Sequence, residues 1–374
     1  MTMRILAATC ITAGLISCSL FDENASLDTL WITLDEAQVP TASVSGALGP
    51  DLFYSMRGRA NPAIDPRLLA VHRRADGELV WERTIDGPCD PPILSAGRMF
   101  CPGSTLSTFD AVTGEPLWTF EPDSALSLVS GTADAERVYA GTLMSAIALD
   151  AATGALVWQR GFSGPWAQIR MRSLTLASNG DLLVAFSGEF ERNVVFSVSV
   201  IVAVDPATGE ERWRFVDGDE TTDKDIGGLT LWEGLALYVS ATGREAVAVD
   251  LATREVVWRA PMGPTAFSGE QPPAVRDGVA YYTDTTGGVY AVDARTGAEI
   301  WTTQRPAGFF GQTVCGDLLY TDNPIGEFFR LSDGRYVGDA VERDSDDIAG
   351  QTASADGVLY LSADSGVYAF DCRL

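Results

Sequence analysis

Side chains that commonly carry catalysis are scarce in this sequence. His72 is the only histidine among 374 residues, so a catalytic triad, a histidine base or a histidine metal cluster has one candidate at most. Cys89, Cys101, Cys315 and Cys372 form no C-x-x-C redox or zinc motif. These counts argue against most catalytic classes, and we expect His72 to be structural or exposed.

Carboxylates are plentiful, and two acidic runs lie in predicted connecting segments. The first contains Asp217, Asp219, Asp223 and Asp225, and the second spans residues 344–347. Closely spaced carboxylates suit Ca²⁺, a hard cation that takes about six to eight oxygen ligands. Neither run has the spacing of a known calcium loop, and solvated loops are the alternative interpretation. The four aspartates remain calcium candidates on composition alone.

The N-terminal segment has the pattern of a bacterial lipoprotein signal peptide. Arg4 precedes an apolar stretch, residues 5–16, that is too short for a permanent membrane-spanning helix. The stretch leads into the sequence Leu-Ile-Ser-Cys at Cys18, which resembles the lipobox that lipoprotein signal peptidase cleaves. An ordinary signal peptide with an incidental cysteine is the alternative.

Three expectations follow from this resemblance. Residues 1–17 are a signal peptide, Cys18 is the lipidated N-terminus of the mature chain, and residues 18–26 are a tether. Ser19, rather than Asp, follows the cysteine, which by the rule of that family implies an outer-membrane lipoprotein facing the periplasm. Several acyl chains on one residue would hold the protein firmly to the membrane.

The charge balance argues against nucleic-acid binding. The chain has 26 Lys and Arg residues and 51 Asp and Glu residues, which gives a formal net charge of −25. Contacts to phosphate groups need a basic patch. Beyond the N-terminal segment, no uninterrupted run of apolar residues is long enough to predict a transmembrane helix. The length suits two domains or one large all-β domain.

One repeated unit predicts the fold. An apolar strand ends in Ala-x-Asp, a Thr-Gly turn follows, and a Trp comes four residues after the Gly. The copies lie at Arg73/Trp81, Asp110/Trp118, Asp150/Trp158, Asp205/Trp213, Asp250/Trp258, Asp293/Trp301 and, without the Trp, Asp333. Gly permits the positive φ of a tight hairpin, Asp or Thr satisfies the turn amides, and Trp packs between layers. The spacing is close to the roughly 40–50 residues of a four-stranded propeller blade.

The count of strands predicts how the ring closes. In each blade the third strand comes before the repeated turn and the fourth, outer strand comes after it. Seven turns are followed by an outer strand. Residues 366–371 have the pattern of a third strand in an eighth blade, but no outer strand follows them. The segment Leu30-Trp31-Ile32-Thr33 resembles the outer strands around Trp118 and Trp301. We predict an all-β, eight-bladed propeller of four-stranded antiparallel blades over residues 27–374, closed by an N-terminal strand that completes the last blade. Seven blades with a loose N-terminus is the alternative.

Four cysteines allow three disulfide pairings, and the predicted topology favours one of them. Cys89 and Cys101 would reach one face of a single blade, and Cys315 and Cys372 would reach the opposite face of two adjacent blades. We therefore predict the disulfides Cys89–Cys101 and Cys315–Cys372, as an oxidising envelope compartment permits.

The repeat resembles that of the pyrroloquinoline-quinone (PQQ) type propellers over nearly all of the mature chain. One branch, the quinoprotein dehydrogenases, is usually longer and carries a vicinal Cys-Cys over the cofactor and calcium ligands in large loops, and this sequence has no Cys-Cys pair. The other branch is the lipoprotein subunit of the outer-membrane barrel-assembly machinery. Similarity to that branch implies a monomeric, non-enzymatic scaffold for protein partners, without cofactor. An envelope lipoprotein with an unrelated partner is the alternative, and a PQQ-dependent dehydrogenase is a further one.

Aromatic residues in the connections are the candidate partner contacts. Trp166, Phe267, Phe309 and Phe310 all fall in predicted connections on one face of the ring, where exposed aromatics suit an interface. The alternative is that they cap the core or the seams between blades. The fourth blade also has an overlong hairpin, with an apolar strand expected at residues 194–204, which suits either a docking arm or tolerated variation.

Overall fold

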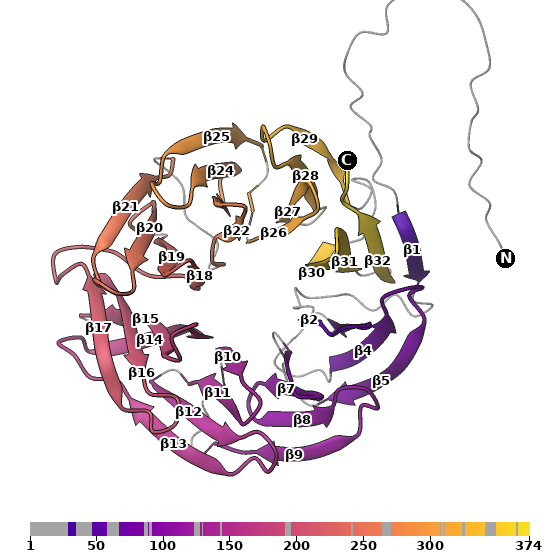
Figure 1. Ribbon diagram of the computed structural model, residues 1–374, viewed down its shortest axis with the longest axis horizontal. Helices are drawn as coiled ribbons and strands as arrows, with labels where there is room; N and C mark the ends of the chain where they lie inside the picture. The colour runs from indigo at the N-terminus through magenta and orange to yellow at the C-terminus, as the bar shows by residue number, and fades with distance from the viewer. Residues whose placement is uncertain are drawn as a thin grey trace, which may run out of the picture.

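The computed structural model describes residues 29–34, 47–57, 67–85, 89, 92–122, 128, 130–142, 144–190, 196–240, 242–263, 271–306, 308–309, 311–323, 326–340, 349–363 and 366–374. These residues form eight four-stranded antiparallel sheets that follow one another around a central axis, as Figure 1 shows. Within these ranges no helix is long and apolar enough to span a bilayer. The eight-bladed, all-β propeller predicted from the repeat is confirmed.

Each blade runs from an inner strand near the axis to an outer strand at the rim. The inner strands are β2 (Ala47–Leu48), β6 (Ile93–Ser95), β10 (Ser130–Ala133), β14 (Gln168–Leu176), β18 (Thr230–Trp232), β22 (Ala274–Arg276), β26 (Gly311–Cys315) and β30 (Ala349–Ala355). The second strands are β3 (Leu52–Arg57), β7 (Arg98–Pro102), β11 (Arg137–Gly141), β15 (Leu182–Glu189), β19 (Leu235–Ser240), β23 (Val279–Thr283), β27 (Leu318–Asp322) and β31 (Val358–Ala363).

The third and outer strands complete the blades. The third strands are β4 (Arg67–Arg73), β8 (Leu106–Asp110), β12 (Ser145–Asp150), β16 (Ser197–Val204), β20 (Glu245–Asp250), β24 (Gly288–Asp293), β28 (Glu327–Arg330) and β32 (Gly366–Asp371). The outer strands are β5 (Leu79–Ile85), β9 (Pro116–Phe120), β13 (Leu156–Gly161), β17 (Glu211–Asp217), β21 (Val256–Pro261), β25 (Glu299–Gln304), β29 (Tyr336–Asp339) and, for the eighth blade, β1 (Thr29–Leu34).

Burial follows the position of a strand within its blade. All eight residues of the third strand β16 are buried, because both of its faces pack against neighbouring blades. The outer strand β13 buries only Trp158, since its neighbours splay apart at the rim. The core is therefore a set of seams between blades rather than one central cluster. The apolar strand expected at residues 194–204 begins at Ser197, and residues 191–195 lie outside the described ranges.

The repeated turn owes its shape to the Asp and the Gly. Asp110 Oδ1 accepts hydrogen bonds from the amides of Val112, at 3.0 Å, and Thr113, at 2.8 Å, and from the Thr113 hydroxyl at 3.0 Å. Gly114 then has a φ of +70°, a left-handed conformation that glycine adopts without strain. The Asp satisfies turn amides as the sequence predicts.

The Trp of each repeat closes the seam to the next blade. A Cβ placed on Gly154 would lie 2.5 Å from the ring of Trp118, so the indole lies flat against the glycine of the following turn. Trp118 Nε1 also donates to the Ala151 carbonyl at 3.2 Å, and Trp158 donates likewise to Pro206 at 2.9 Å. The turn glycine is needed for its conformation and for this close approach.

The ring closes through the N-terminal strand. β1 pairs antiparallel with β32, with Ile32 opposite Tyr368 and Thr33 opposite Val367. The predicted closure is confirmed, and the seven-blade alternative is excluded. The indigo β1 lies at the rim beside the yellow C-terminal blade in Figure 1. β1 therefore covers the outer edge of β32, which would otherwise be unpaired.

Two disulfides join the cysteine pairs expected from the topology. Cys89, in a connection, is bonded to Cys101 on β7, and Cys315 at the end of β26 is bonded to Cys372 directly after β32. The second bond ties the seventh blade to the strand that β1 closes. Asp317 N also donates to the Cys372 carbonyl at 2.8 Å, so the C-terminal residues are fixed beside the closure.

Candidate functional site

Connections between blades and the hairpins between second and third strands share one face of the ring. We call it the connection face and define it by residues 162–167, 218–229, 242–244, 284–287 and 308–309. It holds the described partner candidates Trp166 and Phe309 and three of the four calcium candidates, while Asp217 ends β17 at its border. His72 lies away from it, buried on β4, where its Nδ1 is 3.1 Å from the Gly77 carbonyl oxygen.

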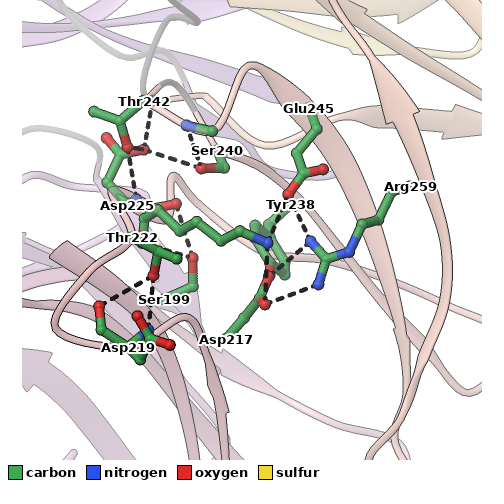
Figure 2. A network of polar contacts seen from close by, with 12 residues as sticks. Ser199, Asp217, Asp219, Thr222, Asp225, Tyr238, Ser240, Thr242, Glu245 and Arg259 are labelled. Atoms are coloured by element: carbon green, nitrogen blue, oxygen red, sulfur yellow. Dashed lines mark hydrogen bonds and ion pairs between the residues drawn. The ribbon is translucent and has the colours of Figure 1, made fainter. Parts of the chain in front are cut away.

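Asp217 is the centre of an ion-pair network between the fourth and fifth blades (Figure 2). The two terminal nitrogens of Arg259 on β21 donate to its two carboxylate oxygens, each at 2.8 Å. Lys224 Nζ lies 3.3 Å from the same carboxylate, and the Tyr238 hydroxyl donates to it at 3.0 Å. Side chains of two blades and of the segment between them therefore converge on one carboxylate that is 9% exposed.

Glu245 balances the charge of this network. Its carboxylate accepts from Arg259 at 2.5 Å and lies 3.2 Å from Lys224 Nζ. Burial acts to raise the pKa of Asp217, but the hydrogen bonds and charge of Arg259, with the charge of Lys224, hold that pKa below its ordinary 3.8. The Asp217 contacts raise the pKa of Arg259, so the pair stays ionised at neutral pH. Two cations and two carboxylates thus neutralise each other locally.

Polar contacts hold the segment after Asp217 in place. The Thr242 amide and hydroxyl donate to Asp225 Oδ1 at 3.0 and 3.1 Å, and the Ser199 hydroxyl donates to the Asp225 carbonyl at 2.8 Å. Asp219 Oδ1 accepts from the amide and hydroxyl of Thr221, at 2.8 and 2.6 Å. The acidic run is an ordered connection rather than a solvated loop.

These contacts give each calcium candidate a partner of another kind. Asp217 binds Arg259, Asp219 caps a turn, Asp223 accepts from Ser197 at 2.8 Å, and Asp225 binds the fifth blade. In the part of the chain that the structure describes, no three His, Cys, Asp or Glu side chains gather so that they could hold a metal ion. The four carboxylates point to separate partners because each satisfies a different backbone or cationic group.

Little in the sequence indicated this network. Arg259, Glu245 and Tyr238 occupy ordinary strand positions of the fifth blade and belong to no motif. The one available signal was Lys224, the only lysine of the chain, inside an acidic run. A lysine that is unique in its chain and flanked by aspartates marks an ion pair better than a metal site.

The aromatic candidates separate into one surface residue and one core residue. Trp166 is half-buried and packs edge-on against Phe186, with ring centroids 5.7 Å apart. Phe309 is fully buried and packs edge-on against Phe329 at 6.0 Å, which places it in a seam, the alternative left open by the sequence. Phe267 and Phe310 lie outside the described residues.

Trp166 belongs to an aromatic group at the end of the fourth blade. We call this group, Phe162, Trp166, Phe186 and Phe190, the blade-four aromatic cluster. A Cβ on Gly164 or Gly188 would lie within 3.0 Å of the Trp166 ring, so both glycines make room for the indole. Phe196 is 36% exposed, and its carbonyl accepts from the Phe190 amide at 3.2 Å. Phe190 and Phe196 lie in the hairpin that departs from the repeat, and Phe162 lies in the connection before β14, so no repeat position indicated them as contacts.

The described residues do not reproduce a quinoprotein site. All four cysteines in the described ranges are used in disulfides between residues that are distant in sequence, so they supply no vicinal pair over a cofactor. The acidic candidates for a calcium ligand set are separated and occupied by other partners, as described above. The chemistry of these side chains therefore does not fit PQQ with calcium.

Comparisons with known proteins agree on the fold. A family model described as outer membrane protein assembly factor BamB matches residues 28–200 and 197–373. No curated protein sequence matches the chain. The crystal structure of BamB from Moraxella catarrhalis is similar with a TM-score of 0.68 at 16% identity, covering 92% of this chain and 97% of that chain.

Quinoprotein enzymes share the same architecture. A europium-containing methanol dehydrogenase is similar with a TM-score of 0.68 at 12% identity, covering 90% of this chain and 84% of its own. A quinohemoprotein alcohol dehydrogenase from Comamonas testosteroni has a TM-score of 0.68 at 11% identity, covering 93% and 77%. At such identities these likenesses show the fold alone.

Proposed function

Because the chain belongs to the family described as outer membrane protein assembly factor BamB, we propose that it is a non-enzymatic scaffold in outer-membrane β-barrel protein assembly. The observation that carries the proposal is the family match, which extends over residues 28–373 and so over every described blade. The misfit of the described side chains to a PQQ site supports a binding role over a catalytic one.

The proposed location follows from the N-terminal pattern. Residues 1–17 act as a signal peptide, Cys18 carries the lipid anchor, and residues 18–26 form the tether, so the propeller of residues 27–374 faces the periplasm from the outer membrane. The scaffold acts as a monomer bound to protein partners of the barrel-assembly machinery. These segments lie outside the described residues, and the sequence alone supports their roles.

The proposed contact surface is the blade-four aromatic cluster with Phe196. Aromatic side chains supply much of the energy of protein interfaces. Phe196 is exposed, and Trp166 is partly exposed, as are Phe162 and Phe190. The ion-pair network around Asp217 fixes the neighbouring connection, so little conformational entropy is lost when a partner binds. An ordered polar rim beside an apolar centre is the usual anatomy of an interface.

Affinity purification tests this function. The tagged full chain is recovered from solubilised outer membranes, and its partners are identified by mass spectrometry. We expect the barrel-assembly subunits to co-purify, and a double variant Trp166→Ala, Phe196→Ala to recover them several-fold less well. Ile300→Ala, an exposed apolar residue on β25, is the control and leaves recovery unchanged. Purification of an unrelated partner would favour an envelope lipoprotein with another role.

The shared architecture with quinoprotein dehydrogenases defines the competing function. A PQQ-dependent enzyme would bind PQQ with calcium, quench tryptophan fluorescence on titration and reduce an artificial electron acceptor with alcohol substrates. The scaffold proposal expects none of these responses from the purified chain. Saturable PQQ binding with turnover would refute it.

A further inference from the structure

Exposed apolar side chains are unevenly distributed around the rim. Of the fourteen large apolar residues that are exposed in the described ranges, seven lie on the outer strands of the eighth, first, second and third blades, and three lie on the other four outer strands. The former strands, β1, β5, β9 and β13, follow one another along the rim in Figure 1. We define the apolar arc by Leu30, Ile32, Leu79, Val80, Leu117 and Val157, each between 41% and 49% exposed.

The remaining rim is less apolar. β17, β21 and β25 each carry one such residue, Val216, Val257 and Ile300, and the described part of β29 carries none. On β17 the residues beside Trp213 are Arg212 and Arg214, which are engaged with carboxylates. Single exposed apolar residues are common on any surface. β1, β5 and β13 carry two each and β9 between them carries Leu117, so the exposed apolar residues favour one side of the ring.

The start of the described chain lies within this arc. β1 begins at Thr29, only eleven Cα–Cα steps after Cys18. Covalent geometry limits that span to about 40 Å when fully extended. If Cys18 is lipidated, as proposed above, the β1 side of the rim is held within that distance of the lipid headgroups, and no such limit applies to the opposite rim.

We propose that the apolar arc rests on the periplasmic surface of the outer membrane, so that the propeller stands with this part of its rim against the lipid headgroups. The inference rests on the proposed lipid anchor and adds an orientation to it. The contact lies at headgroup depth, because outer strands have unpaired backbone groups that must stay hydrated. The anchor makes this contact intramolecular, so side chains that would bind lipid weakly in free solution are sufficient. The net charge of −25 keeps the rest of the molecule away from anionic lipid.

Site-specific photocrosslinking tests this orientation. The photoreactive residue p-benzoylphenylalanine replaces Val80 or Leu117 in the arc, or, as matched controls, Val257 or Ile300 on the other side of the ring. The control positions are 47% and 50% exposed and the arc positions 41% and 48%, so the two sets are about equally accessible. The lipidated full chain is irradiated in outer-membrane vesicles, and phospholipid adducts are measured by mass spectrometry. Sedimentation with the vesicles, recorded beforehand, reports on the anchor.

The expected result is a several-fold higher yield of phospholipid adducts from positions 80 and 117 than from positions 257 and 300. Equal yields in a chain that sediments with membranes would overturn the orientation and leave the anchor intact. Adducts to a second copy of the chain or to another protein at positions 80 and 117 would overturn it as well, because the arc would then be a protein interface. A chain that does not sediment would refute the lipid anchor itself.

Discussion

Asp217 shows how single residues stabilise the connection between two blades. It is almost fully buried and depends on the bidentate contact with Arg259 for its charge. A buried carboxylate that loses its cation keeps its desolvation penalty and loses its compensation. The network is therefore sensitive to removal of either member.

We expect Arg259→Met to lower the free energy of unfolding by about 2 kcal/mol, less than for a fully buried pair because Arg259 is partly exposed and Lys224 remains near Asp217. Urea denaturation followed by tryptophan fluorescence measures the change. Arg276→Met removes an exposed pair with Asp277 and is the control, expected to change stability by less than about 0.5 kcal/mol. Equal losses of stability in the two variants would contradict a larger contribution of the network than of an exposed ion pair.

The acid dependence of stability follows from the same residue. The pKa of Asp217 in the fold lies below its ordinary 3.8, so its contribution is fully present above that value and is lost as the pH falls through the lowered pKa. We expect the wild-type chain to lose stability below about pH 4 more steeply than Asp217→Asn does. Urea midpoints measured from pH 6 downward test this, and parallel curves for the two proteins would contradict it.

At the residue scale the sequence predicted types of side chain better than their roles. It indicated Trp166 and Phe309 together, because both fall in connections rich in apolar residues. Burial separates them, since Phe309 fills a seam and Trp166 lies at the surface. Pairings such as Asp217 with Arg259 join positions 42 residues apart, and only the register of two neighbouring blades brings them together.

At the scale of the element, the hairpin with its Trp contact is the unit that builds the ring. Gly97 and Gly154 both have a φ of +74°, but only Gly154 lies against an indole, that of Trp118. The two glycines therefore separate the backbone requirement from the seam contact.

We expect Gly97→Ala to destabilise the fold by about 1 kcal/mol, because alanine is strained in the left-handed backbone conformation of this position. Gly154→Ala adds overpacking against Trp118 and should be destabilising by about 2–4 kcal/mol in total. Chemical denaturation of the two variants measures the difference. If both lose the same stability, the Trp contact does not determine the spacing of the blades.

The hairpins were predictable because each depends on residues adjacent in sequence. Asp, Thr and Gly act within one turn, so their pattern reports the structure directly. In the copy at Asp250, Arg254 takes the place of the turn glycine. It keeps the turn with a φ of +64°, and its guanidinium lies 5.5 Å from the centre of the Trp213 ring. The long hairpin of the fourth blade was not predictable in detail, because its aromatic packing depends on the preceding connection.

At the scale of the whole molecule, ring closure joins the two ends of the chain. It could be predicted because a missing outer strand at one end matched an unassigned strand at the other. The face to which each cysteine points then followed from the strand order. The side of the ring that binds a partner did not follow, because it depends on exposure rather than on the repeat.

The two disulfides should differ in their contribution to stability. Cys315–Cys372 closes a segment of 57 residues and ties the closing blade to its neighbour, whereas Cys89–Cys101 closes only 12. Because a longer loop loses more entropy in the unfolded chain, replacing the first pair by serine should cost about 1 kcal/mol more than replacing the second. Thermal and urea denaturation of both double variants measure this. A larger loss from the shorter loop would contradict the closure account.

The central claim is that this propeller assists the assembly of outer-membrane β-barrels as a scaffold rather than as an enzyme. The most direct measurement follows newly made barrel proteins in cells that lack the chain, using the different gel mobility of folded and unfolded barrels. We expect slower conversion to the folded form in these cells. The wild-type chain should restore the rate, and the Trp166→Ala, Phe196→Ala variant should restore it poorly. Unchanged conversion in the absence of the chain would contradict it.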